Sequence, residues 1–214
     1  MRIVMVTPHY HPYIGGVEEV VSNQSRSLIN NGHAVTVHTF NYGKLPHEEF
    51  LDGVLVRRHT PILPEPFSLP PESLVKGILS ERADVFHLHN LHTSLPLLVP
   101  LMRRRARRIV LQPHYHGSGQ TGARNLFFHG YRLLLQSVIP RIHAVLVNTP
   151  FEGEMFARDF PCTKYMALLP EALGSDFGTV EWSPEQAPRR ILYVGPLRKY
   201  KNVDKLLQAF ADLR

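Results

Sequence analysis

The sequence opens with MRIVMVTPHYHPYIGGVEEVVSNQSRSLINNGHAVTVHTF (residues 1–40), and this stretch decides the fold class. The apolar run at residues 3–6 stops at Thr7-Pro8, as expected for a buried parallel strand. Residues 17–31 carry apolar side chains at helical spacing, with two glutamates in the first turn that suit the helix dipole. The β-branched residues 34–40 predict a second strand. Strand, helix and strand in this order indicate a βαβ unit.

The same alternation continues along the chain. We expect further strands at residues 54–59, 85–89, 109–112, 144–148 and 165–169, and helices at residues 72–80, 93–105, 125–139 and 150–159. The proline-rich residues 61–71 predict a loop between two of these elements. Alternation of this kind is typical of α/β proteins with a Rossmann-like, doubly wound parallel sheet.

A change in composition divides the chain. Residues 170–189 are rich in Pro, Gly, Glu and Ser, which is typical of a linker. A strand at residues 191–194 and a helix from about Val203 then restart the pattern. We therefore expect a Rossmann-like domain at residues 1–169, a linker at residues 170–189, and the first strand and helix of a second Rossmann-like domain at residues 190–214.

Composition limits the function classes. The 214 residues are 43% hydrophobic and 20% charged, as in ordinary soluble proteins. The net charge of +6 favours anionic partners, but no helix-turn-helix, zinc finger or RNA-binding signature accompanies it, so nucleic acid is not an expected partner. The single cysteine, Cys162, fits a reducing cytoplasm. Neither a signal-peptide core nor a run of about 18 apolar residues is present, so we expect no membrane span.

A glycine pair, Gly15-Gly16, stands at the first strand-to-helix turn. Glycines there leave backbone N–H groups free to face a ligand, and the start of a helix favours a phosphate. The pattern is not the dinucleotide fingerprint, and no P-loop lysine follows. A tight turn with unusual backbone dihedrals explains the pair equally well.

Histidines gather where the predicted strands end. His87 and His89 share one strand face, and we expect His92, His114 and His116 close by at the same edge of the sheet. Zinc sites use three or four such ligands, but the cluster has no cysteine and no His-Glu-x-x-His helix, so no metal site is predicted. For His87 we favour a core histidine whose ring is satisfied by hydrogen bonds.

The run RRRARR contains Arg103, Arg104, Arg105, Arg107 and Arg108. Such a run suits either the solvated end of the expected helix or an anionic membrane surface, where each cation contributes on the order of 1 kcal/mol. The apolar segment at residues 125–139 is either an interfacial helix or, as we favour, a helix buried under the sheet. Together the two features favour a lipid-linked acceptor and a peripheral place at the inner face of the cell membrane.

Several stretches match one family in the correct order. They are the Gly15-Gly16-x-Glu18 turn with GHAV (32–35), DGVLV (52–56), DVFHLH (84–89), QPH (112–114), AVLVNTPFE (144–152) and ILYVGPLRKYKNVDKLLQAF (191–210). Each motif is weak by itself. In this order, and over nearly the whole chain, they resemble the retaining GT-B glycosyltransferases of the glycogen-synthase-like family, also called family four.

The resemblance implies transfer of a sugar from a UDP-, GDP- or ADP-linked donor to an acceptor hydroxyl with retention at the anomeric carbon. It implies no metal and no cofactor beyond the nucleotide-sugar substrate. Synthesis of a glycolipid or an envelope polysaccharide is the expected setting. In this family the N-terminal domain holds the acceptor, and the C-terminal domain holds most of the nucleotide.

The resemblance also implies roles for single residues. Gly15 and Gly16 approach the donor diphosphate or the transferred sugar, and Lys201 with Arg198 binds the phosphates. His114 lies beside the sugar near the reaction centre, and His116 is a second catalytic candidate because the alignment can slip by two residues. The acceptor-side candidates are His9, Glu18, His89 and Asn90.

Three positions depart from the family pattern. Pro196 replaces an arginine that holds the diphosphate, Asn202 replaces a glycine, and PEAL (170–173) replaces Pro-Asn-Gly-Val. The family's paired donor-site glutamates are expected beyond Arg214, so we expect this chain to be inactive alone. Two alternatives stay open: a nucleotide-sugar epimerase-like enzyme, which needs no acceptor, and a non-catalytic carbohydrate- or membrane-binding module.

Overall fold

The computed structural model describes residues 1–65, 67–117, 122–171, 191–195, 197 and 201–212. The chain divides into two compact units, Met1–Gly174 and Ser175–Arg214. The division falls inside the expected linker at residues 170–189, most of which lies outside the described residues.

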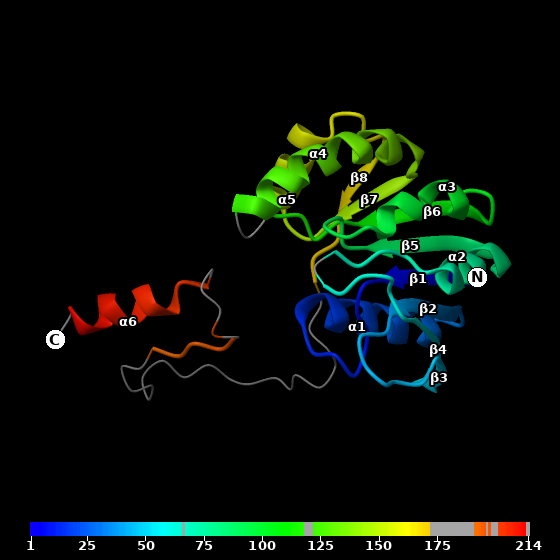
Figure 1. Cartoon of the computed structure of the whole chain (residues 1–214), viewed down its shortest axis with the longest axis horizontal. Helices are drawn as coiled ribbons and strands as arrows, with labels where there is room; N and C mark the ends of the chain where they lie inside the picture. The colour runs from blue at the N-terminus through cyan, green and yellow to red at the C-terminus, as the bar shows by residue number, and fades with distance from the viewer. Residues whose placement is uncertain (66, 118–121, 172–190, 196, 198–200, 213–214) are drawn as a thin grey trace. The chain divides into compact units, whose positions relative to one another are not determined.

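The first unit is built on an eight-stranded sheet (Figure 1). Its strands are β1 (Arg2–Thr7), β2 (Ala34–Phe40), β3 (Glu48–Leu51), β4 (Val54–His59), β5 (Ala83–His89), β6 (Ala106–Gln112), β7 (Ala144–Val147) and β8 (Met166–Leu168). Their order is β3-β4-β2-β1-β5-β6-β7-β8, and every neighbouring pair is parallel except β3 and β4. The predicted doubly wound α/β fold is confirmed. The strand order reverses beside β1, and ligands of such sheets bind beyond the carboxyl ends near this reversal.

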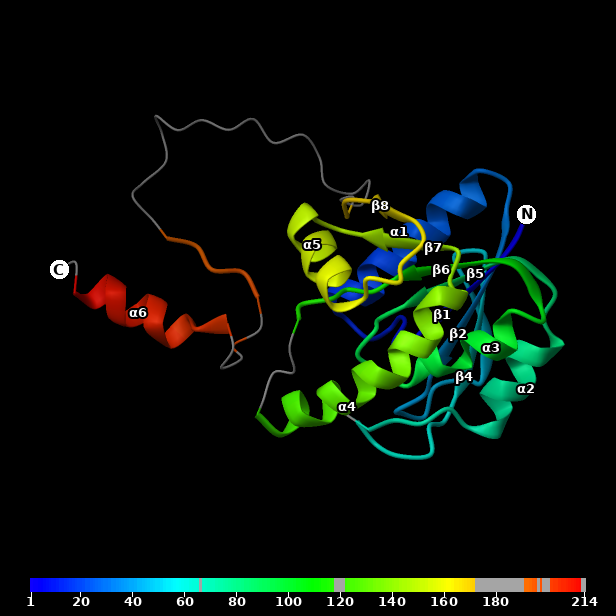
Figure 2. The ribbon, with the colours of Figure 1, turned by 90° about the horizontal axis from the view of Figure 1, so that it is seen from above.

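Helices cover both faces of the sheet. They are α1 (Gly16–Asn30), α2 (Glu72–Ser80), α3 (Val99–Met102), α4 (Gly122–Val138) and α5 (Pro150–Asp159), with the 3-10 turns η1 (Leu95–Leu98) and η2 (Ile139–Arg141). Val21 of α1 packs against one face, whereas α2, α3 and α4 pack on the other (Figure 2). A parallel sheet needs cover on both faces because its strands are apolar on both sides.

The expected helix at residues 125–139 packs as the buried interpretation requires. Phe128, Tyr131, Leu135 and Val138 of α4 join the larger core cluster. Leu133 and Leu134 point the other way and are exposed. The helix is therefore one-sided, with an apolar core face and an outer face that also carries leucines.

Two elements differ from the sequence-based expectation. Strand β3 was not predicted, because its side chains alternate between exposed and half-buried and form no apolar run. The expected helix at residues 93–105 was wrong in its extent. The segment forms η1 and the short α3, each with a proline in its first turn, and β6 begins already at Ala106. Because Ala106 pairs with Ala83 of β5, Arg107 and Arg108 belong to the strand. The hydrophobic periodicity of the sequence does not predict this extension.

In the second unit, α6 (Val203–Ala211) forms where a helix was expected. Asn202 precedes it with φ 53°, a left-handed conformation that suits glycine and, next best, asparagine. The strand expected at residues 191–194 is wrong, since the described residues 191–195 carry no strand. A parallel strand forms only against a partner. That this unit starts a second Rossmann-like domain stays a proposal.

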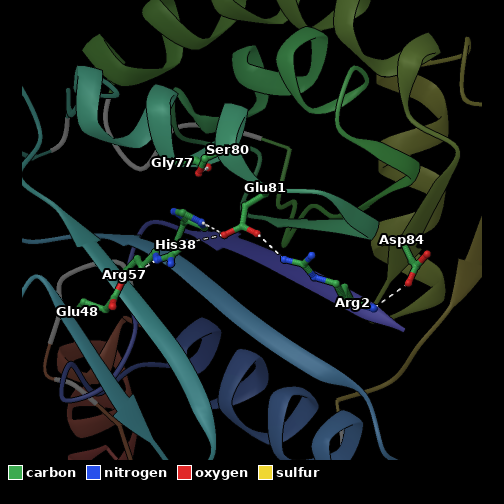
Figure 3. Close-up of polar contacts among 8 residues, drawn as sticks. All are labelled: Arg2, His38, Glu48, Arg57, Gly77, Ser80, Glu81 and Asp84. Carbon is green, nitrogen blue, oxygen red and sulfur yellow. Dashed lines mark hydrogen bonds and ion pairs between the residues drawn. The ribbon is translucent and has the colours of Figure 1, made fainter.

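A buried carboxylate ties α2 to the sheet (Figure 3). Glu81 follows α2 and accepts a hydrogen bond from Arg57 Nη1 at 2.6 Å. Its carboxylate also lies 3.4 Å from His38 Nε2 and 3.5 Å from Arg2 Nη2. The hydrogen bond with His38 and the nearby cations lower the pKa of Glu81, although burial opposes them. The cluster lies within the fold and anchors the end of α2 to β2 and β4.

Candidate active site

Two groups of side chains lie at the carboxyl ends of the parallel strands. The His114 cluster consists of His87, His89, His114, Asn148 and Glu171, from β5 and the segments after β6, β7 and β8. The His9 cluster consists of His9, Tyr13, Tyr42 and Glu65, from the loops after β1, β2 and β4. Both follow from the parallel topology, which brings these strand ends to one edge of the sheet.

His114 is held on both sides of its ring. Asn148 Nδ2 lies 3.2 Å from His114 Nδ1, and His114 Nε2 lies 3.4 Å from His89 Nδ1. The backbone of His114 has φ 47°, in the left-handed region, and its side chain is 11% exposed. The imidazole therefore has a fixed orientation before any ligand arrives.

A chain of amides fixes the proton positions. Gln24 Nε2 donates to Gln112 Oε1 at 2.8 Å, and Gln112 Nε2 donates to Asn148 Oδ1 at 2.6 Å. Asn148 is left with its Nδ2 to donate, to His114 Nδ1 and to Glu171 Oε1 at 3.0 Å. Because Nδ1 of His114 accepts, its Nε2 carries the proton in the neutral ring and faces His89 Nδ1.

Burial keeps the histidines neutral. It lowers the pKa of His114 to about 4 and, with the charge of His114 as a smaller cause, the pKa of His87 to about 3. Burial, followed by His87 and His114, also holds the pKa of His89 well below its ordinary value. Near neutral pH the cluster therefore carries no positive charge. It suits a neutral ligand better than a phosphate.

The expectation that hydrogen bonds satisfy the ring of His87 was wrong at one nitrogen. Within the described residues, neither His87 Nε2 nor His89 Nε2 has a hydrogen-bond partner. The two rings instead pack together with centroids 4.2 Å apart. In the same part of the chain, no group of three or more His, Cys, Asp or Glu side chains is placed to hold a metal ion.

His116 lies apart from His114. It is exposed and packs on His92, with ring centroids 4.2 Å apart. Tyr115 separates the two histidines, and its backbone N–H donates to Glu152 Oε1 at 2.6 Å. Asn148 donates its backbone N–H to Glu152 Oε2 at 2.7 Å. The buried Glu152 thus joins the segment after β6 to the start of α5.

Sequence reasoning missed the role of Glu152, although a signal exists. Thr149 caps α5, and its side chain accepts the N–H of Glu152. A threonine followed three residues later by glutamate resembles a capping box. Recognising it would have placed Glu152 at the helix start, beside the end of β7.

A cavity of about 450 Å³ opens beside His114. Its lining residues are His114, Tyr115, His116, Asn148, Thr149, Phe151, Glu152, Met155 and Glu171. All of them belong to the first unit. The volume is in the range of small-molecule sites.

The His9 cluster is held together by one polar contact and by ring contacts. His9 Nε2 lies 2.6 Å from Glu65 Oε1, and its ring contacts Tyr13 and Tyr42 at centroid distances of 5.4 and 4.9 Å. Burial raises the pKa of Tyr42 to about 12, so its hydroxyl stays protonated and donates to Ser68 at 2.9 Å. Of this cluster, the sequence suggested only His9.

The glycine turn is open to one side. Gly15 precedes α1 in an extended conformation, and Gly16 is its first helical residue, so the explanation by unusual dihedrals was wrong. A Cβ at Gly15 would lie 2.3 Å from Glu18 Oε2, whereas a Cβ at Gly16 would meet nothing within 4 Å. Glu18 thus covers Gly15.

The other two acceptor-side candidates lie at the end of β5. Asn90 forms a turn with φ 72° and accepts the N–H of His92, while His89 is fully buried.

The remaining candidate residues lie elsewhere. Arg103, Arg104 and Arg105 follow α3, and Arg107 and Arg108 begin β6; all five are exposed. They lie at the amino end of β6, about 20 Å along the strand from the His114 cluster. Lys201 belongs to the second unit and is exposed. Arg198 and Pro196 lie outside the described residues. No helix in the described ranges is long and apolar enough to cross a membrane.

Known proteins agree with this architecture. One component of the human phosphatidylinositol N-acetylglucosaminyltransferase is 29% identical over 137 residues, which cover 64% of this chain and 24% of that protein. Sucrose-phosphate synthase from Thermosynechococcus elongatus superimposes with a TM-score of 0.59 at 14% identity, over 79% of this chain and 47% of that one. Trehalose-6-phosphate synthase gives a TM-score of 0.57 at 11% identity, over 81% and 50%.

The chain therefore spans about a quarter of the human relative and about half of these two structures. The structural matches carry the GT-B fold, of which this chain corresponds roughly to the N-terminal domain. The family model described as Glycosyltransferase Family 4 matches residues 14–170, well over half of the sequence. The chain belongs to Glycosyltransferase Family 4, a family of retaining glycosyltransferases.

Proposed function

We propose that this protein transfers a sugar from a nucleotide-sugar donor to an acceptor hydroxyl, with retention at the anomeric carbon. The chain described here supplies the acceptor-side domain. The observation that carries the proposal is the neutral, immobilised His114 beside a cavity at the carboxyl edge of a Family 4 sheet.

The donor is a nucleoside diphosphate sugar. Two structures with related folds are described with such nucleotides: an α-glucosyltransferase with UDP, and starch synthase IV from Arabidopsis thaliana with ADP and acarbose. In our proposal the open Gly15-Gly16 turn faces the diphosphate, because free N–H groups at a helix start favour anions. In our proposal Lys201 and Arg198 supply positive charge, which stabilises the negative charge that develops on the leaving diphosphate.

His114 contacts the transferred sugar. A neutral imidazole held on both sides lies against the sugar without drawing the diphosphate toward it, and orientation of this kind lowers the barrier through positioning. His116 stands as a second contact at the cavity mouth. His89 acts through His114, since it is fully buried.

The acceptor enters along the His9 cluster. His9, Glu18 and Asn90 follow or neighbour the ends of β1 and β5, beside the strand-order reversal. The name of the human relative describes a phosphatidylinositol acceptor, which supports a lipid-linked acceptor here. The exposed arginine run supports contact with an anionic membrane from the cytoplasmic side.

The test is donor turnover by the full-length protein. UDP-, GDP- and ADP-sugars are incubated with it, with and without a mixed lipid extract, and the released nucleotide is measured. We expect release from one donor, and more of it with the extract. Conversion of the sugar without any acceptor would favour the epimerase-like alternative. No release by correctly folded protein would favour the non-catalytic binding module.

A further inference from the structure

Arg58 of β4 is among the largest fully buried side chains of the protein. It belongs to neither cluster at the carboxyl ends of the strands, and the proposed function does not use it. Burial of a cation is costly unless its charge and its donors are paired. The partners of Arg58 therefore indicate what this side chain holds in place.

Arg58 ends a row of paired residues on the face of the sheet that α1 covers. Thr7 of β1 pairs with Thr39 of β2, and Thr39 pairs with Arg58. Two residues earlier, the same face carries the paired apolar residues Met5, Val37 and Val56. Threonine is short, so the long side chain of Arg58 can extend across β2 toward the chain that follows β1.

The guanidinium of Arg58 joins two loops and the edge strand. Its Nη2 donates to the carbonyl of His11 at 2.6 Å, and its Nη1 donates to the carbonyl of Pro46 at 3.3 Å. Nη1 also pairs with the carboxylate of Glu49 on β3, which balances the buried charge. Arg58 thus ties the loop after β1 to the loop that precedes β3.

The β1–α1 loop, residues 8–15, carries the glycine turn. Tyr10 is buried in the core beside α1, and the carbonyl of the next residue, His11, accepts from Arg58. Four residues after His11, Gly15 leads directly into α1. The contact with Arg58 therefore lies between the buried start of the loop and the glycine turn at its end.

We propose that Arg58 is the positioning residue of the glycine turn: by holding the carbonyl of His11, it fixes the β1–α1 loop so that the N–H groups at Gly15 and Gly16 face the donor diphosphate. This inference rests on the proposed function and deepens it, because it names a residue that sets donor affinity without touching the donor. Arg58 is not itself a phosphate ligand, since it is fully buried and Glu49 balances its charge.

The first test measures the order of the loop, by hydrogen exchange of the full-length protein without any nucleotide sugar. In Arg58→Lys the positive charge stays beside Glu49, but a single ammonium does not span Glu49 and His11 as the planar fork of arginine does. We expect the amides of residues 9–16 to exchange about tenfold faster than in wild type, because local opening becomes easier. Equal exchange in the two proteins overturns the inference.

The second test measures the donor KM and kcat of the full-length protein. A contact that the bound donor already makes, and that persists in the transition state, affects KM and not kcat. We therefore expect Arg58→Lys to raise the donor KM about tenfold, with kcat within about threefold of wild type. A lower kcat at unchanged KM, or no change in either, overturns the positioning role.

A double variant separates positioning from stability. Arg58→Met with Glu49→Gln removes both charges, so no unpaired charge stays buried and the fold is retained, while the contact with His11 is lost. Loop exchange and donor KM should both rise as in Arg58→Lys. A folded double variant with the loop exchange of wild type overturns the inference.

Arg57→Lys is the matched control. Arg57 precedes Arg58 on β4 and points to the opposite face of the sheet. Its hydrogen bonds lead to Glu48 and Glu81, which lie on β3 and at the end of α2. The control should therefore leave loop exchange and donor KM as in wild type.

Equal effects of Arg57→Lys and Arg58→Lys mean that loosening of the sheet edge, and not the contact with His11, is responsible, and they overturn the inference. Failure of the proposed function is a separate outcome. Absence of nucleotide release by wild type contradicts the transferase, whereas the exchange comparison still tests the hold of Arg58 on the loop.

Discussion

At the scale of single residues, the protonation of His114 depends on one amide. Asn148 Nδ2 donates to His114 Nδ1 because Asn148 Oδ1 is already occupied by Gln112. Asn148→Asp replaces that donor with a carboxylate oxygen, which accepts a hydrogen bond from a protonated Nδ1. An opposite charge at this distance should raise the pKa of His114 from about 4 by about 1 to 3.

Histidine side-chain NMR titration measures this change. The matched control is Asn31→Asp, an exposed asparagine after α1 that adds the same charge far from the cluster. A pKa of His114 that is the same in Asn148→Asp and in wild type contradicts the assigned hydrogen-bond network.

The imidazole of His114 should matter more for turnover than that of His116. His114→Asn is the suitable change, since asparagine tolerates the left-handed φ of 47° better than alanine does. We expect turnover of the full-length protein to fall roughly 100-fold, as for loss of one positioned hydrogen-bonding group. His116→Asn should cost clearly less, because His116 is exposed and packs on His92. Equal losses in the two variants contradict the placement of His114.

The sequence predicted that the histidines lie close together, but it did not predict which side chains contact the residues of the two clusters. His87, His89 and His114 follow from strand ends, since parallel topology brings such ends together. Glu65, Glu152 and Glu171 lie in loops or at a helix start, and only folding places them against His9, Tyr115 and Asn148. A loop carboxylate has no periodic signal that would predict its partner.

At the scale of elements, the close approach of α2 to the sheet depends on the missing side chain of Gly77. A Cβ there would lie 2.8 Å from His38 Cε1 and 3.4 Å from His59 Cε1. Gly77→Ala should therefore lower the free energy of unfolding by about 1 to 3 kcal/mol, the usual cost of overpacking.

Urea unfolding compares this variant with Gly130→Ala. Gly130 lies within α4, and a Cβ there would meet nothing within 4 Å. The control should stabilise the protein by about 0.5 to 1 kcal/mol, because alanine is the better helix former. A Gly77→Ala variant as stable as wild type would show that α2 can shift away from His38.

Strands were predicted correctly where the hydrophobic run is continuous. The prediction failed where a strand forms only because it pairs with a neighbouring strand. Strands β1, β2 and β5 are buried over most of their length, and their runs predicted them. Strand β3 is an antiparallel edge strand without such a run, and β6 begins with an alanine and two arginines, of which Ala106 and Arg108 pair with β5. Both exist because a neighbour offers hydrogen bonds, which a single window of sequence does not contain.

At the scale of the whole molecule, buried neutral histidines should make the fold sensitive to acid. Burial, the main cause in each case, lowers the pKa of His59 to about 4, of His87 to about 3 and of His114 to about 4. The unfolded chain binds protons near pH 6.5, whereas the folded chain does not. Stability is therefore full above about pH 6.5 and falls as the pH drops toward 4.

At pH 5 each such histidine should cost on the order of 1 to 2 kcal/mol relative to pH 7. Urea midpoints at the two pH values measure the loss. His59→Gln should reduce the slope with pH, because it removes one of these histidines. Equal midpoints at pH 7 and pH 5 contradict burial of neutral histidines.

The arginine run and α4 together form the surface that we propose for membrane contact. Arg103 Nη1 donates to the carbonyl of Arg141 at 3.2 Å, which joins the residue after α3 to η2, the turn that follows α4, and Leu133 and Leu134 are exposed on α4. Cations and exposed leucines together suit an anionic headgroup layer over acyl chains. We expect the protein to bind vesicles of phosphatidylcholine and phosphatidylserine, and to release them at high salt.

The variant Arg103→Gln, Arg104→Gln, Arg105→Gln removes three charges, and at about 1 kcal/mol each it should weaken vesicle binding roughly 100-fold. Its control removes three charges elsewhere, through Lys44→Gln, Lys76→Gln and Lys164→Gln, all at exposed positions. Weakening by the arginine variant alone locates the contact at this edge of the sheet. Equal weakening by both variants means that net charge, and not this surface, attracts the membrane.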